Sequence, residues 1–84
     1  MEQYYIIDCE ARFRGRIHIS KPRYDTLSEA LQEAGKAADQ YISTATAYEL
    51  SWNENKMLYM KIKRVFEQNG RICGMCTVGC VFLY

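Results

Sequence analysis

The stretch KIKRVFEQNGRICGMCTVGCVF, residues 61–82, decides the fold of this chain of 84 residues. Its central dipeptide, Asn69-Gly70, is the strongest short signal for a two-residue β-turn, because both residues tolerate the positive φ of a type I′ turn. Strand-like runs flank the dipeptide on both sides, so the sequence predicts an antiparallel hairpin. A two-residue turn sets its opposing pairs as Phe66 with Cys73, Arg64 with Met75 and Ile62 with Thr77.

The run from Ile72 to Tyr84 is apolar at both odd and even positions. This pattern is typical of a strand that is covered on both faces or lies centrally in a sheet. Regular alternation would send Cys73 to one face of the sheet, and Cys76 and Cys80 to the other.

A helix is predicted earlier in the chain, from Thr26 to about Ile42. Thr26 and Glu29 have the spacing of a capping box, in which a threonine side chain caps the helix and a glutamate follows three residues later. From there to about Ile42 the apolar residues recur at helical spacing and predict one buried stripe. The stripe consists of Leu27, Ala30, Leu31, Ala34, Ala37, Ala38, Tyr41 and Ile42.

The segment from Tyr5 to Ile19 alternates between apolar and polar residues, which predicts strand. A loop at Phe13-Arg14-Gly15 would make it a hairpin that pairs Cys9 with Ile19. A single long strand with a bulge at Gly15 fits the pattern equally well. Tyr48, Leu50 and Trp52 alternate in the same way and predict a further strand, with Trp52 in the core.

Residues 1–84 therefore form one α+β domain, with an antiparallel four- to five-stranded sheet and one helix packed on one face, in the order β(β)αβββ. A domain of this length supports one helix on one sheet and leaves no room for a deep second layer. An enclosed pocket for a small molecule is not expected.

Charge is unevenly distributed along the sequence, although the net charge is only +1. Residues 25–54 carry −5, whereas residues 9–24 and 55–84 carry +4 each. Placed on the predicted fold, this makes the helix acidic and the sheet face opposite the helix basic. A sheet face that combines cations with exposed apolar side chains is a candidate contact surface.

Three cysteines, Cys73, Cys76 and Cys80, include a C-x-x-C spacing that would be compatible with zinc. Zinc sites of this kind use a turn on which the thiolates converge, whereas this run alternates as a strand. We therefore expect structural cysteines, with no metal and no other cofactor.

Several functional classes lack the residues they require. The only histidine is His18, and the sequence has neither a glycine-rich phosphate loop nor a G-x-S-x-G motif, so we expect no enzyme. No leader pattern and no apolar stretch of about 20 residues are present. We expect a cytoplasmic protein with reduced cysteines and no membrane contact.

In format the chain resembles small proteins of phages and mobile elements that block host defence, including anti-CRISPR proteins. The resemblance lies in the N-terminal strand Tyr4-Tyr5-Ile6-Ile7, one capped helix starting at Thr26, a following antiparallel sheet and no catalytic set. It rests on no motif, so no residue role is transferred. It implies a non-enzymatic, stoichiometric inhibitor that occludes a surface of a host defence complex of the CRISPR type.

The predicted function is accordingly protein binding, with a nucleic-acid-binding module on the basic sheet face as the alternative. A homodimer that buries Phe82 and Tyr84 against each other is a further hypothesis. The predicted contact set consists of Arg12, Arg14, Arg16, Tyr59, Lys61, Lys63, Phe82 and Tyr84. The second candidate surface is the acidic helix, with Glu29, Glu33 and Asp39.

Overall fold

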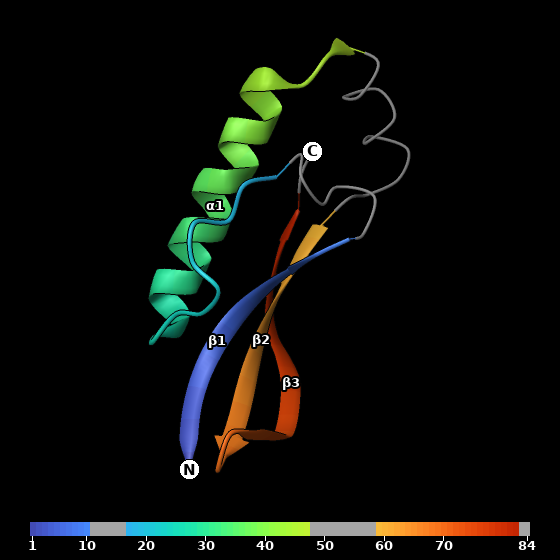
Figure 1. Cartoon of the computed structure of the whole chain (residues 1–84). Helices are drawn as coiled ribbons and strands as arrows, with labels where there is room; N and C mark the ends of the chain where they lie inside the picture. The colour runs from blue at the N-terminus through green and yellow to red at the C-terminus, as the bar shows by residue number, and fades with distance from the viewer. Residues whose placement is uncertain (11–16, 48–58, 83–84) are drawn as a thin grey trace.

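The computed structural model describes residues 1–10, 17–47 and 59–82. They form a three-stranded antiparallel sheet in the order β1-β2-β3, with the helix α1 against one of its faces (Figure 1). The elements are β1 (Glu2–Cys9), α1 (Leu27–Thr44), β2 (Tyr59–Gln68) and β3 (Arg71–Phe82). The α+β class and the antiparallel sheet are confirmed.

The hairpin between β2 and β3 is the predicted one. Asn69 and Gly70 connect the two strands with φ values of 52° and 76°. Positive φ at both positions is the requirement of a type I′ turn, which matches the twist of the strands it joins.

The register of this hairpin differs from the prediction because β3 contains two irregularities. Phe66 lies opposite Gly74, Arg64 opposite Cys76 and Ile62 opposite Gly79. Cys73 and Val78 are extra residues of β3 at the two register shifts, as in a β-bulge. Each extra residue reverses the alternation, so Cys76 and Cys80 lie on opposite faces of the sheet, contrary to the prediction.

Thr26 is confirmed as the N-cap of α1. The Thr26 hydroxyl accepts a hydrogen bond of 3.1 Å from the backbone N–H of Glu29. The Glu29 carboxylate accepts a 2.9 Å hydrogen bond from Lys21 Nζ, which ties the preceding loop to the first helical turn. The helix extends to Thr44, slightly beyond the predicted end, and Ala45 caps it.

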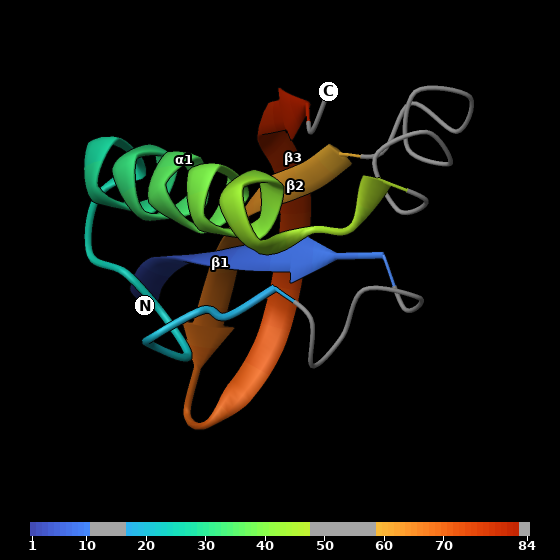
Figure 2. The same cartoon turned by 90° about the horizontal axis from the view of Figure 1, so that it is seen from above.

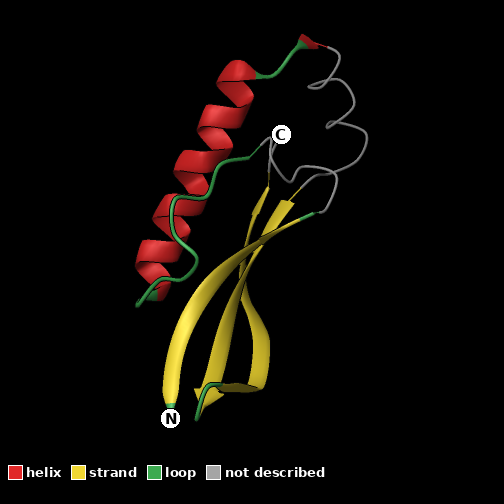
Figure 3. Cartoon of the chain, in the orientation of Figure 1, coloured by secondary structure: helices red, strands yellow, loops and turns green. Residues whose placement is uncertain are grey.

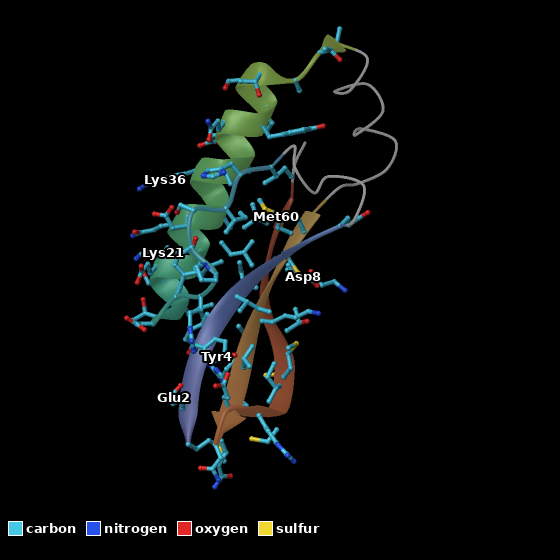
Figure 4. The ribbon with its side chains drawn as sticks, viewed as in Figure 1. Glu2, Tyr4, Asp8, Lys21, Lys36 and Met60 are labelled. Atoms are coloured by element: carbon cyan, nitrogen blue, oxygen red, sulfur yellow. The ribbon has the colours of Figure 1, made fainter. Side chains whose placement is uncertain are left out.

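The core lies between α1 and the sheet. Ala30 and Ala34 of the helix, and Met60 and Ile62 of β2, are completely buried. Figure 4 shows Met60 in the space between helix and sheet. Small alanine side chains allow the helix to approach the sheet closely, and at Gly79 an added Cβ would lie only 3.4 Å from the Leu31 side chain. Leu31 and Ile42, predicted for the buried stripe, are 37% and 38% exposed.

The N-terminal strand is shorter than predicted. It ends at Cys9, which pairs with Met60 of β2. The predicted pairing of Cys9 with Ile19 is wrong, because Ile19 forms no β-bridge. Ile19 lies outside any strand, and Ile17 forms a single β-bridge position. The predicted loop at 13–15 and the predicted strand at 48–52, with Trp52, lie outside the described residues, in which three strands are present instead of four or five.

The sheet is longer than the region that α1 covers. The described part of the molecule measures 46 × 19 × 19 Å, and the turn end of the β2–β3 hairpin extends beyond the first turn of α1 (Figure 3). Seen from above, α1 lies on one side of the sheet (Figure 2). The other face carries no further helix or strand among the described elements.

Candidate interaction surfaces

The open face is the face of the sheet opposite α1, and the strand register defines its members. Residues that lie directly opposite each other in neighbouring antiparallel strands share a face. Four rows therefore cross the sheet from β1 through β2 to β3: Glu2, Glu67 and Ile72; Tyr4, Val65 and Met75; Ile6, Lys63 and Thr77; and Asp8, Lys61 and Cys80.

Among the described residues, the open face has mixed charge, whereas the sequence predicted a basic surface; Arg12, Arg14 and Arg16 of that prediction lie outside the described residues. Lys61 and Lys63 are accompanied by the carboxylates of Glu2, Asp8 and Glu67 in the same rows. Lys63 Nζ lies 3.0 Å from an Asp8 carboxylate oxygen, and both side chains are partly exposed. Figure 4 shows Asp8 on the side of β1 away from α1. The cations of β2 are thus compensated by anions of β1.

An apolar strip runs through the middle of these charges. Val65 is completely buried although it lies on the open face, where Tyr4 and Met75 are its neighbours in the adjoining strands. Met75 and Ile72 of β3 remain 45% and 57% exposed. Apolar side chains surrounded by charges of both signs are typical of the contact surfaces that proteins offer to other proteins.

A polar cluster closes the turn end of the open face. The Tyr4 hydroxyl donates a 2.7 Å hydrogen bond to Glu67, and the Arg23 guanidinium lies 4.7 Å from the Tyr4 ring centre. The hydrogen bond to the Glu67 carboxylate raises the pKa of Tyr4, since ionisation of the phenol would break it. Arg23 Nη1 also lies 3.8 Å from the Glu2 carboxylate.

The face that carries α1 has a polar row of its own beyond the helix. Tyr5, Arg64 and Cys76 lie side by side across the three strands. The Tyr5 hydroxyl accepts hydrogen bonds from Arg64 Nε at 3.3 Å and from Gln3 Nε2 at 3.2 Å. These two donors, Arg64 first, lower the pKa of Tyr5 because they stabilise the phenolate.

The predicted contact set is only partly described by the structure. Lys61 and Lys63 lie on the open face, half-buried in β2. The backbones of Tyr59 and Phe82 pair with each other at the end of the hairpin. Arg12, Arg14, Arg16 and Tyr84 lie outside the described residues.

The acidic helix is less strongly charged than its sequence suggests. Glu29 forms an ion pair with Lys21 at 2.9 Å, and Glu33 lies 3.5 Å from Lys36 Nζ on the same helix. Asp39 is exposed. The second candidate surface therefore combines one exposed carboxylate with two that have cationic neighbours (Figure 4 shows Lys21 and Lys36 on the outer side of α1).

The cysteines of β3 are spread over both faces. Cys73, Cys76 and Cys80 are exposed thiols that form no disulfide, and Cys73 Sγ donates to the Phe66 carbonyl oxygen at 3.4 Å. Within residues 1–10, 17–47 and 59–82, no group of three histidine, cysteine or acidic side chains is placed to hold a metal ion.

The two outer edges of the sheet differ, and the sequence reasoning missed this feature. At the β1 edge, Tyr5 and Tyr24 exchange two backbone hydrogen bonds of 2.8 Å each. At the β3 edge, no strand of the described residues pairs with the chain. The signal was the uncharged run from Ile72 to Phe82, which the sequence analysis attributed to a covered or central strand.

Comparison with known proteins gives no family for this chain. No protein-family model matches it, and neither the curated proteins nor the solved structures contain a significant match. Among the described residues, no helix is both long and apolar enough to cross a membrane.

Proposed function

We propose that the chain is a small, non-enzymatic protein-binding domain whose partner contacts the open face of the sheet. One observation carries the proposal: α1 covers only one face, and the other presents a strip of partly exposed apolar side chains between charges of both signs. A partner that covers Met75 would remove apolar surface from water, and the surrounding charges would fix its orientation.

The proposed contact set remains the predicted one, with Lys61 and Lys63 at its described centre. Arg12, Arg14 and Arg16 would add positive charge to the rim, and Tyr59, Phe82 and Tyr84 would add aromatic surface. By its resemblance in format to anti-defence proteins, the chain would act as a stoichiometric inhibitor that occludes part of a host defence complex in the cytoplasm.

The mixed charge favours a protein partner over nucleic acid. Binding to phosphates requires a surplus of cations on the contact surface. On the described open face, however, the Lys63 ammonium lies against the Asp8 carboxylate. A phosphate would have to displace this carboxylate from Lys63 and would be repelled by its negative charge. A basic contact would then depend on Arg12, Arg14 and Arg16.

Affinity capture with matched charge-reversal variants tests this proposal. The bait Lys61→Glu/Lys63→Glu should lose at least about 90% of the partner that the unchanged chain captures, because like charges at the contact oppose binding. The bait Glu33→Lys/Asp39→Lys reverses two charges on α1 instead and should retain the partner. Circular dichroism melting verifies that both baits are folded.

Two results would contradict the proposal. The partner could still be captured by the bait with reversed charges on the open face but be lost by the bait with reversed charges on α1. That result would place the site on the acidic helix. Anisotropy titrations with single- and double-stranded oligonucleotides at about 50 mM salt test the alternative, because low salt favours phosphate contacts. Binding there, with a steep loss at higher salt, would favour the nucleic-acid-binding module.

A further inference from the structure

The outer edge of β3 is the other unusual surface of this molecule. Between Ile72 and Phe82 the strand carries no charged residue, and Ile72 and Met75 are strongly exposed. Proteins normally protect an edge strand with charges, proline or a covering segment, because its backbone groups can pair with another strand. The question is which strand fits this edge.

The backbone hydrogen bonds at the opposite edge identify the outward-facing positions of β3. Tyr5 exchanges its backbone hydrogen bonds with Tyr24, so its N–H and C=O point away from β2. Hydrogen-bonded and non-hydrogen-bonded pairs alternate across an antiparallel ladder. Arg64, opposite Tyr5, therefore directs its groups toward β3 and pairs there with Cys76.

Cys76 thus points its backbone groups inward, and its neighbours Met75 and Thr77 point theirs outward. Beyond the extra residues Cys73 and Val78, the alternation restarts with opposite parity. Glu67 faces Ile72, and Lys61 faces Cys80, which makes Ile72 and Cys80 outward-facing as well. The outward positions from Ile72 to Cys80 are therefore Ile72, Met75, Thr77 and Cys80, and Phe82, opposite Tyr59, follows as a fifth at the end of the strand.

These four positions are symmetric about Cys76. Met75 and Thr77 lie one residue before and after it, and Ile72 and Cys80 lie four residues before and after it. A second copy of β3, turned by a two-fold axis through Cys76, would place Met75 opposite Thr77 and Ile72 opposite Cys80. Each of these four positions would then meet another of the four, and both irregularities would be accommodated, while Phe82 would lie beside the turn at Gly70. An isologous contact of this kind closes after two copies.

We propose that the chain forms a homodimer in which the β3 edges of two copies pair antiparallel about Cys76. The two sheets join into one continuous sheet of six strands, in which the exposed Met75 and Ile72 side chains gain Thr77 and Cys80 of the second copy as cross-strand neighbours. Two copies with a net charge of +1 each repel one another little. The dimer uses the backbone edge of β3, whereas the partner proposed above contacts the open face, and Met75 belongs to both surfaces.

Sedimentation equilibrium at about 100 µM protein tests the dimer, because small interfaces associate weakly. The expected mass is twice 9.8 kDa. The variant Met75→Lys/Thr77→Lys places like charges opposite each other in both central pairs and should halve the mass, since such pairs oppose pairing. Its equimolar mixture with Met75→Glu/Thr77→Glu should restore the dimer mass.

The matched control is Gln32→Lys/Gln40→Lys, which adds the same two charges at exposed positions of α1 and should remain dimeric. All four positions that receive charge are exposed, so each variant should fold, as circular dichroism will verify. A monomeric unchanged chain, or a Met75→Lys/Thr77→Lys variant that keeps the dimer mass, would overturn the proposal.

Cross-linking tests the register. On the two-fold axis the two Cys76 residues form a non-hydrogen-bonded pair with Cα atoms about 4.5 Å apart, which lies within the range of a disulfide. With diamide as oxidant, a variant that retains only Cys76 should form a covalent dimer. A variant that retains only Cys80 should not, because Cys80 would face Ile72. The reverse result, or no cross-link through Cys76, would exclude this register.

Discussion

The two outer edges of the sheet differ in whether another segment of the chain pairs with their backbone groups. At the β1 edge, Tyr24 completes the backbone hydrogen bonds of Tyr5, and its side chain fills the core with only 2% exposed. At the β3 edge, the described residues provide no covering segment, and from Ile72 to Phe82 the strand carries no charged side chain. A covered edge contributes to the stability of the fold, whereas an uncovered edge is available for association with another strand.

This comparison predicts that the two edges respond differently to truncation. Tyr24→Ala should lower the free energy of unfolding by about 3–5 kcal/mol, because it removes a buried aromatic side chain and leaves a cavity. Met75→Ala at the open edge should change it by less than about 0.5 kcal/mol in dilute protein, since Met75 is largely solvated. Urea unfolding measures both values, and similar losses for the two variants would contradict the comparison.

A smaller effect on stability is expected at the start of α1, just after the segment at Tyr24 that pairs with the β1 edge. Thr26→Ala removes the acceptor for the Glu29 N–H and should cost about 1 kcal/mol of unfolding free energy. Ser28→Ala, an exposed neighbour in the first turn, is the control and should cost less. Thermal or urea unfolding distinguishes them, and equal costs would mean that the Thr26 cap does not stabilise the helix.

The smallest expected effect is the pH dependence of stability near the β1 edge, where the phenols of Tyr4 and Tyr5 lie. Between Ile72 and Val81, β3 carries thiols instead. The pKa of Tyr5 is lowered and the pKa of Tyr4 is raised. As pH rises through the tyrosine range, the folded state therefore gains stability at Tyr5 first and loses it at Tyr4 later. The Tyr Cζ resonances should show Tyr5 titrating first, and Glu67→Gln should bring the Tyr4 midpoint down.

Coincident Tyr4 and Tyr5 midpoints would contradict this assignment of the hydrogen bonds. So would a Tyr4 midpoint that does not move in Glu67→Gln, because the carboxylate is the largest cause of its shift.

The local elements could be predicted because their signals are contained within a few neighbouring residues. Asn69-Gly70 requires no distant partner to favour its turn, and Thr26 caps a helix with a backbone N–H three residues away. The alanine-rich stripe likewise follows from helical periodicity alone. None of these features depends on where the rest of the chain lies.

The surfaces could not be predicted in the same way. The open face was expected to be basic because residues 9–24 and 55–84 carry +4 each. In the described part of the sheet, however, register pairs Lys63 with Ile6, and the Asp8 carboxylate lies 3.0 Å from the Lys63 ammonium group. The prediction that Cys76 and Cys80 share one face was wrong, because a single extra residue between them, Val78, inverts the alternation.

By itself, then, the sequence determined the hairpin turn, the capped helix and the α+β class, since each arises from short-range backbone preference and periodicity. Only the tertiary structure decided which strand lies at the outer edge, where the extra residues of β3 fall and which charges meet on the open face. These properties depend on how the strands pair, either across more than 50 positions, as between Tyr5 and Arg64, or within the hairpin, as between Ile62 and Gly79. Alternation within one strand carries no information about its neighbour.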